Sequence, residues 1–176
     1  MCNLRIFLLF SMVVITSSLD AQTDERFSRF TFEGATGTAP NGWTRDFDGH
    51  GGLRMAPRDA TGFFLEAAMT KVPPRWKGDV TPPLVFLHDL NLFEGEHPAF
   101  RELPGDRAVA VSDYTVKTGR GYVRHRGYYV VLRAKADTMY VVVATASEPV
   151  PTPNAPFTTA HIRDAENAIL GIIVDK

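Results

Sequence analysis

The chain has 176 residues, of which 44% are hydrophobic and 22% charged, with 19 lysines and arginines against 20 aspartates and glutamates. This composition excludes a wholly disordered or low-complexity chain, and the length fits one domain better than two. A net charge of -1 also removes the electrostatic argument for nucleic acid, which requires a basic surplus, so we expect no nucleic-acid partner.

The first 21 residues have the layout of a cleavable secretory signal peptide. A basic residue precedes the apolar run at 6–15, and small residues then lead to Ala21, with cleavage after Ser18 as the alternative. The run is too short to span a bilayer, which takes about 20 apolar residues. We therefore expect a signal peptide at 1–21 and a single domain at 22–176, secreted or periplasmic and without a transmembrane span. An uncleaved N-terminal anchor is the other interpretation.

Cys2 is the only cysteine, and it lies within the expected signal peptide. A mature chain without thiols cannot use a thiolate nucleophile, a thiolate metal ligand or a disulfide. Its stability must then come from packing.

The rest of the sequence predicts strands, one short helix, a strand meander and a final helix. Alternating apolar residues indicate the strands, and glycine and proline clusters separate them. The expected strands cover 27–33, 43–47, 53–55, 63–69, 108–116, 122–133 and 138–146. The expected loops include 34–42, 95–105 and 148–158. The continuous apolar run at 140–144 is typical of a strand that is covered on both faces.

Two helices are predicted. Thr81 can cap the first, and Pro82 and Pro83 fit its opening positions, where backbone amides have no partner. Leucines at a spacing of three then continue it to about Leu92. Apolar residues at spacings of three and four predict the second helix, over 159–174.

A Phe-rich opening strand, the Pro-Asn-Gly-Trp sequence at 40–43, and the strands at 128–133 and 139–146 before a terminal helix form a distinctive order. This order resembles the PsbP-like fold, which is shared with the Ran-binding nuclear import factor of the Mog type and with bacterial envelope proteins. The resemblance implies the α+β class, with a central antiparallel sheet and helices packed on it as an α/β/α sandwich. It also implies a protein that mainly binds partners and has no catalytic constellation, and we expect no cofactor. The signal peptide excludes a nuclear-transport role by analogy.

Three side chains near a glycine-rich turn are candidates for a metal site. Asp46, Asp48 and His50 alternate, so they would share one face if the strand continued. Carboxylates together with an imidazole suit zinc or manganese, and such a site would support a metal-assisted hydrolase. The alternative is a solvated turn, in which aspartate and glycine are the expected residues.

Basic and aromatic residues gather on one expected hairpin. Arg124 and Arg126 share a strand face with Tyr122 and Tyr128, and Arg120 precedes them at the turn. This surface could bind a protein partner or an anionic ligand, because guanidinium groups pair with carboxylates and phosphates. The alternative is a solubilising sheet edge, where basic side chains discourage strand addition.

No complete catalytic set is visible in the sequence, which lacks the G-x-S-x-G elbow and a recognisable serine triad. We therefore expect an exported, non-catalytic binding module that docks onto an envelope or secreted partner through its loops and the basic hairpin. The first alternative is a small-ligand-binding protein with an apolar cavity lined by Phe63, Leu65 and Tyr140. The second is the metal-assisted hydrolase.

Overall fold

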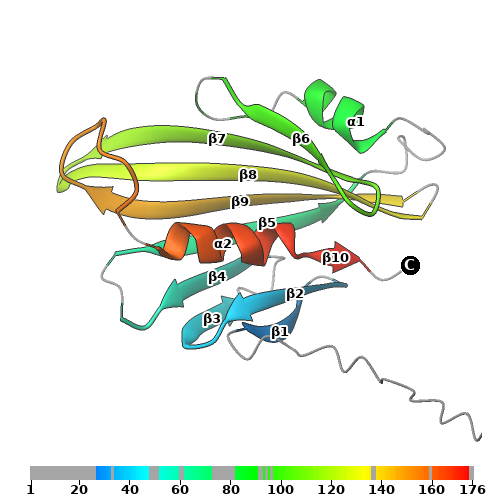
Figure 1. Cartoon of the computed structure of the whole chain (residues 1–176), viewed down its shortest axis with the longest axis horizontal. Coiled ribbons are helices and arrows are strands. Elements are labelled where there is room, and N and C mark those ends of the chain that lie inside the picture. Colours follow the sequence, from blue (N-terminus) through cyan, green and yellow to red (C-terminus); the bar gives the residue numbers. More distant parts are fainter. Residues whose placement is uncertain are drawn as a thin grey trace, which may run out of the picture.

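The structure is a computed structural model, and it is mostly β-structure (Figure 1). It describes residues 27–32, 34–47, 52–59, 62–72, 82–90, 93, 95, 97–135, 138–158 and 160–174. Within these residues the strands are β1 (Phe27–Phe32), β2 (Ala35–Pro40), β3 (Trp43–Phe47), β4 (Gly52–Pro57), β5 (Phe64–Lys71), β6 (Ala99–Leu103), β7 (Arg107–Thr118), β8 (Gly121–Lys135), β9 (Thr138–Val150) and β10 (Ile173–Val174). The helices are α1 (Pro83–Leu90) and α2 (His161–Leu170).

The larger sheet is antiparallel and runs in the order β3-β4-β5-β9-β8-β7-β6. Its centre is a meander of the long strands β7, β8 and β9, which pair along most of their length. Figure 1 shows these three strands extending beyond the other strands at the end that carries the β7–β8 turn, where the connection between β9 and α2 lies beside them.

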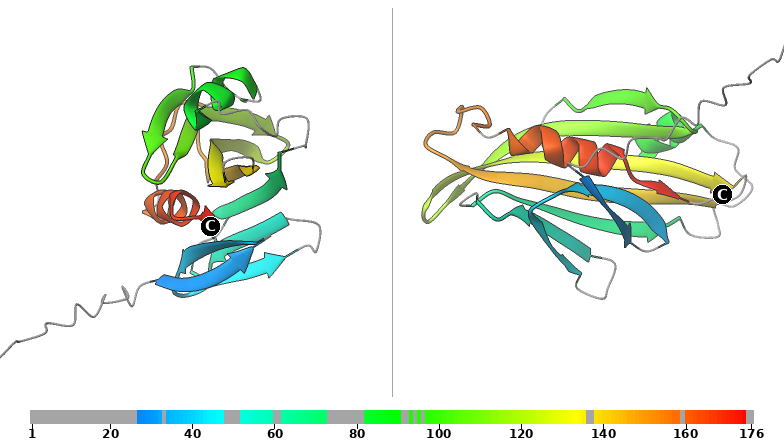
Figure 2. Two further views of the ribbon diagram at one scale, coloured as in Figure 1. Left: turned by 90° about the vertical axis from the view of Figure 1, so that its right-hand side faces the viewer. Right: turned by 60° about the horizontal axis from the view of Figure 1, so that its bottom comes forward.

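The smaller sheet joins segments from the two ends of the domain. It runs in the order β1-β2-β10, so β2 pairs with the opening strand on one side and with the last strand on the other. Figure 2 shows the large sheet curving around α2, with the small sheet beside that helix. The small sheet and α2 together therefore cover one face of the large sheet.

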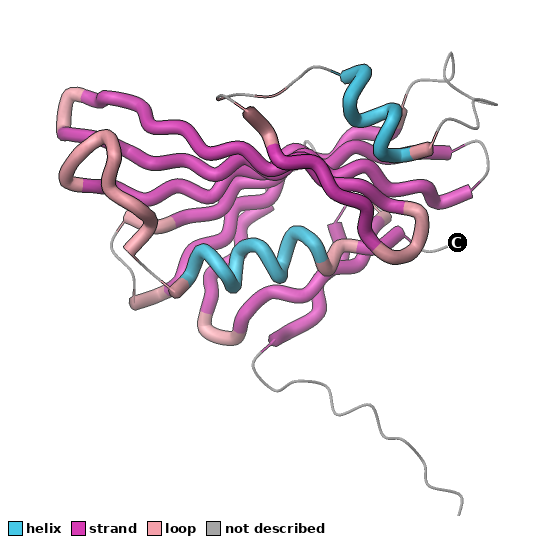
Figure 3. Tube along the Cα trace, turned by 45° about the horizontal axis from the view of Figure 1, so that its top comes forward, coloured by secondary structure: helices cyan, strands magenta, loops and turns pink. Residues whose placement is uncertain are grey.

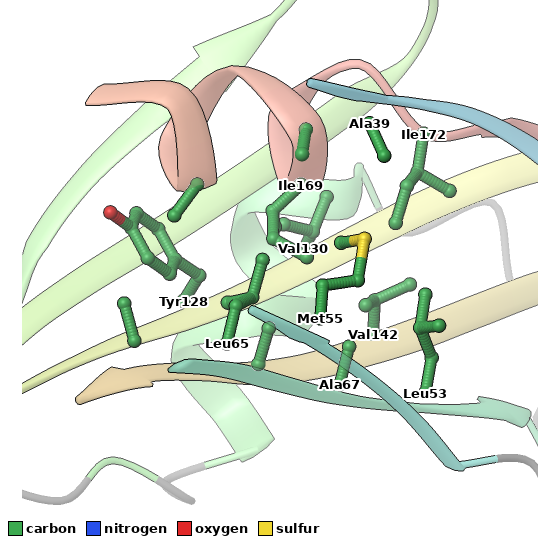
Figure 4. Packing of buried hydrophobic residues seen from close by; sticks show 14 of the residues in the cluster. Ala39, Leu53, Met55, Leu65, Ala67, Tyr128, Val130, Val142, Ile169 and Ile172 are labelled. Carbon is green, nitrogen blue, oxygen red and sulfur yellow. The ribbon is translucent and has the colours of Figure 1, made fainter. Parts of the chain in front are cut away.

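The two faces of β8 contribute to two separate cores. Tyr128, Val130 and Leu132 pack on the side of α2 and the small sheet, whereas Tyr129 and Val131 pack on the side of α1. Successive side chains of a strand point to opposite faces, so one strand can supply both cores. Figure 4 shows the first core, in which Ile169 of α2 lies against Val130 and Met55.

The face of the sheet that carries α1 is only partly covered. In β9, Val142 is buried against the α2 side, but the next residue, Val143, is 36% exposed. The helix α1 packs over β7 and β8, and Figure 3 shows that it lies away from the end of the sheet that carries the β7–β8 turn. The apolar run at 140–144 thus belongs to a central strand, but it is not covered on both faces throughout.

The expected α+β sandwich with helices as its covering layers is wrong. Strands hold most of the described residues, and the helices have only 8 and 10 residues. Three strands form where none was expected. Two of them, β2 and β6, lie in segments that glycine and proline marked as loops, and the third, β10, begins soon after α2 ends at Leu170.

The small side chains of β2 are the reason that its sequence resembles a loop. Ala35, Gly37 and Ala39 are buried, and Gly37 pairs directly with Phe30 of β1. A Cβ atom on Gly37 would lie 2.6 Å from Cζ of Phe30, so the ring occupies the space of the missing side chain. Glycine here permits a close approach between strands and does not mark a turn.

The meander agrees with the sequence prediction, and both helices form but are shorter than predicted, because α2 ends at Leu170 and Ile173–Val174, expected in the helix over 159–174, form β10. The expected strands at 108–116, 122–133 and 138–146 correspond to β7, β8 and β9, and the predicted helices contain α1 and α2. Among the described helices, none is long and apolar enough to cross a membrane. The predicted signal peptide lies outside the described residues.

Candidate functional site

The basic hairpin contains an ion-pair cluster formed by Asp113 of β7 with Arg124 and Arg126 of β8. Arg126 donates from Nε to Oδ1 of Asp113 at 2.6 Å and from Nη2 to Oδ2 at 2.8 Å. Arg124 donates from Nη2 to Oδ2 at 3.3 Å. We call these three residues the arginine cluster.

The charges of the arginine cluster stabilise one another. Burial alone would raise the pKa of Asp113, but the hydrogen bonds and charges of Arg126 and Arg124 outweigh it and hold the pKa below the ordinary value of 3.8. The hydrogen bonds that Arg126 donates to Asp113 in turn raise the pKa of Arg126. The carboxylate therefore neutralises part of the positive charge that the sequence placed on this hairpin.

The arginine cluster also fixes the proline-rich connection between β9 and α2. Arg124 donates from Nη1 to the carbonyl oxygen of Ala155 at 3.0 Å, and the guanidinium groups of Arg124 and Arg126 lie 5.5 and 5.3 Å from the centre of the Phe157 ring. In the same connection, the backbone amide and the hydroxyl of Thr158 donate hydrogen bonds to buried Glu148. These two arginines thus have partners within the chain.

The other predicted hairpin residues lie in three different environments. Tyr128 is fully buried beneath α2 (Figure 4), and burial followed by the charge of Glu166 raises the pKa of its hydroxyl. Tyr122 is half-buried, and Arg120 is exposed at the turn. A binding role for the hairpin stays a prediction, and Tyr128 is not on its surface.

The predicted metal ligands are described only in part. Asp46 is exposed on β3 and pairs in register with Arg54 of β4, whereas Asp48 and His50 lie outside the described residues. Across the described part of the chain, no group of three or more His, Cys, Asp or Glu side chains is placed to hold a metal ion. The metal site at Asp46, Asp48 and His50 therefore stays a prediction.

The residues proposed to line an apolar cavity are packed in the core. Phe63 and Leu65 are 2% and 0% exposed, and Tyr140 is partly buried against the same core. Their side chains fill space between the sheets and α2.

A hollow lies where the β2–β3 turn, the segment after β4 and the start of α2 meet. Its volume is about 920 Å³. Its polar side chains are Asn41, Arg58, Asp59, His161, Arg163, Asp164 and Asn167. We call this site the α2 hollow.

Two aromatic side chains, Trp43 and His161, line the α2 hollow, and Phe63 of the core contacts both of them. Trp43 contacts Phe63 and His161 edge-on, with ring centres 5.8 and 5.9 Å apart, and Phe63 lies 5.7 Å from His161. Trp43 and Phe63 are buried, whereas the His161 side chain is 24% exposed. Its Nε2 lies 3.9 Å from Oδ1 of Asp59. Each of the three rings therefore packs against the other two.

Local sequence explains how the walls are placed. Gly42 has a φ of 86°, a conformation that glycine adopts without strain, and it directs the chain from the small sheet into β3 and Trp43. In α2, His161, Asp164 and Asn167 follow one another at a spacing of three, so they lie along one side of the helix.

The α2 hollow carries balanced charge. An Arg-Asp pair stands on each of two walls, Arg58 with Asp59 after β4 and Arg163 with Asp164 on α2. Within the described residues, the side chains of Arg58, Arg163, Asp164 and Asn167 have no hydrogen-bond or ion-pair partner. Arginines of the long strands, by contrast, are held by partners within the fold.

Sequence reasoning noted the turn at 40–43 for its fold resemblance but did not connect it with α2. The two are far apart in the chain, and neither is a motif for a known chemistry. The repeated Arg-Asp pair was the available signal, and it is too short to distinguish from two solvated charge pairs.

Comparisons with known proteins give the fold and no function. No family model matches the chain, and no curated protein is similar to it. A protein of Bacteroides thetaiotaomicron VPI-5482, known from a crystal structure at 1.50 Å, is similar with a TM-score of 0.59 and 13% identity. The match covers 86% of this chain and 49% of that one, so this chain spans about half of its length. The PsbP-like resemblance gains no support from these comparisons.

Proposed function

We propose that this protein is an exported, non-catalytic binding module that recognises a group of its ligand or partner in the α2 hollow. One observation carries this proposal: three separate segments bring polar side chains of both charges together, and four of those side chains have no partner in the described fold. Arg58, Arg163 and Asn167 are exposed and Asp164 half-buried, so a ligand can reach them.

The make-up of the hollow supports ligand recognition. Binding sites for small molecules are concave, contain convergent polar groups and have volumes of about 300–1,000 Å³, and the hollow shares these three properties although its walls are polar. The ring contacts among Trp43, Phe63 and His161 preorganise the floor, which reduces the ordering cost of binding.

The surroundings of His161 favour binding over proton transfer. Its imidazole packs against two aromatic rings, and its contact with the Asp59 carboxylate, at 3.9 Å, is longer than a hydrogen bond. The expected signal peptide would bring this site to an envelope or secreted partner.

Charge removal at two surfaces tests this proposal. The full chain, expressed with its own N-terminal segment in an export-competent host, is used as bait for envelope and secreted material. The variant Arg58→Ala/Arg163→Ala alters the hollow, and Lys117→Ala/Arg120→Ala is the matched control at the β7–β8 turn. We expect the hollow variant to lose material that the wild type and the control retain.

The opposite result assigns recognition to the hairpin. Loss of binding in Lys117→Ala/Arg120→Ala, with retention in the hollow variant, would overturn the α2 hollow as the recognition site. Equal recovery by all three proteins would overturn it as well.

A further inference from the structure

We propose that the ligand of the α2 hollow is a neutral oligosaccharide. This inference rests on the proposed function, because it names the ligand class of the same site. It comes from three properties of the hollow: its charge balance, the alternation of its donors and acceptors, and its apolar floor.

The charge balance disfavours ionic ligands. A phosphate or a polyanion would meet the carboxylates of Asp59 and Asp164, and a metal cation would meet the guanidinium groups of Arg58 and Arg163. Like charges placed together across an interface oppose binding. A ligand without net charge avoids both conflicts.

Each of two walls carries a donor and an acceptor in consecutive residues, Arg58 with Asp59 and Arg163 with Asp164. Guanidinium groups only donate hydrogen bonds, carboxylates only accept them, and the side-chain amide of Asn167 does both. A sugar hydroxyl also donates and accepts, and neighbouring hydroxyls present both functions a short distance apart. An Arg-Asp pair on each wall is therefore complementary to two adjacent hydroxyl groups.

The floor provides an apolar surface between the polar walls. Pro40 and Trp43 line it, both are buried with only a small part of each side chain accessible, and the hydrogen bonds of the ligand would be made above them. Sugar rings have C–H faces as well as hydroxyl edges, so they match a site with an apolar floor and polar walls. A purely apolar ligand would leave the polar walls without hydrogen-bond partners, which costs binding energy.

Nuclear magnetic resonance of the Trp43 indole N–H reports directly on the hollow. The chain has two tryptophans, so Trp76→Phe assigns the Trp43 signal. The probes are neutral hexasaccharides of glucose, mannose, xylose and N-acetylglucosamine, together with an acidic hexasaccharide of galacturonic acid and the uncharged tripeptide N-acetyl-triglycine amide.

We expect at least one neutral hexasaccharide to shift the Trp43 signal in a saturable manner. Asp164→Ala should weaken that binding by about tenfold, the loss that follows from one hydrogen bond to a charged group. Glu102→Ala removes an exposed carboxylate on β6 and should leave the affinity unchanged.

The remaining outcomes separate this inference from the proposed function. A shift caused only by the acidic hexasaccharide or the tripeptide would overturn the neutral-sugar assignment and leave the hollow as a binding site. If no probe shifts the signal, the sugar assignment is overturned. The proposed function would still be supported if the wild type retained captured envelope or secreted material that Arg58→Ala/Arg163→Ala lost. If no probe shifts the signal and that variant also retains all captured material, both are overturned.

Discussion

Gly37 shows how a single residue can have opposite meanings in sequence and in structure. In the sequence it is one of three glycines at 34–42 that indicate a loop, whereas in the structure it lies inside β2 and faces the ring of Phe30. That ring is 6% exposed and belongs to the core. The missing side chain makes room for it.

We therefore expect Gly37→Ala to destabilise the protein by about 1–3 kcal/mol, the usual cost of overpacking a core. The new Cβ would lie 2.6 and 2.9 Å from two carbons of the Phe30 ring, so the ring must move. Urea denaturation measures the change. Gly119→Ala is the control, because nothing lies within 4 Å of the added atom. Equal stability of the two variants would contradict this packing.

Sequence alone gave the correct face-sharing of Tyr122, Arg124, Arg126 and Tyr128, because side chains of a strand alternate. It did not give the depth of each residue. Tyr128 is fully buried because α2 crosses it, and α2 lies more than thirty residues further along the chain. Burial that depends on a distant element cannot be read from the strand itself.

At the scale of elements, the arginine cluster joins three segments. It connects β7 with β8 and holds the connection at Ala155 and Phe157 against both strands. The sequence predicted this connection as a loop, and no repeating pattern indicated where it would dock.

The lowered pKa of Asp113 predicts a particular pH dependence. A carboxyl group whose pKa falls on folding stabilises the native state above its unfolded pKa, and this contribution is lost as the pH drops through the folded value. We expect Asp113→Asn to cost about 1–2 kcal/mol near neutral pH, because partial exposure screens the ion pair. The difference from wild type should shrink below about pH 4, the range of the unfolded carboxyl group.

Urea denaturation of wild type and Asp113→Asn from pH 3 to 7 measures this difference. Glu102→Gln, at an exposed carboxylate of β6, serves as the control. A cost of Asp113→Asn that stayed constant across the whole range would show that the carboxylate charge has no part in stability.

Elements with regular patterns were predicted well, and short elements that depend on neighbours were not. The meander and both helices follow from their apolar periodicity. The two-residue strand β10 has no pattern of its own and forms because β2 offers an edge to Ile173 and Val174.

At the scale of the whole molecule, the large sheet is a wall shared by two cores. Strand β8 places Val130 in one core and Val131 in the other, and both are fully buried. Loss of packing on either face should therefore weaken the same strands and destabilise the molecule as a unit.

We expect Leu87→Ala in α1 and Ile169→Ala in α2 each to cost about 2–5 kcal/mol, the range for truncating a buried aliphatic side chain. Both side chains are 0% exposed. Unfolding followed by circular dichroism and by tryptophan fluorescence should give one coincident transition for each variant. Val85→Ala, at a residue of α1 that is 48% exposed, should change stability by less than about 0.5 kcal/mol. A separate early transition in Leu87→Ala would show that α1 unfolds independently.

The α2 hollow also exists only at this scale. Its walls come from a turn, a connection after β4 and a helix near the end of the domain, so no local pattern contains it. The hairpin and the glycine-rich turn attracted attention in the sequence because their charged residues are close neighbours along the chain.

The pairing of β2 with β10 constrains the order in which this molecule can assemble. Thr36 must wait for Ile173, its partner in register, which lies more than a hundred residues further along the chain. The meander, with its partners close in sequence, can form early, whereas closing this long-range contact is slow. Until it closes, the opening hairpin keeps an unpaired edge, and such edges recruit other chains. A copy that is still folding is thus most exposed to misassembly just before β10 pairs with β2, and the concentration of such partly folded chains sets that risk.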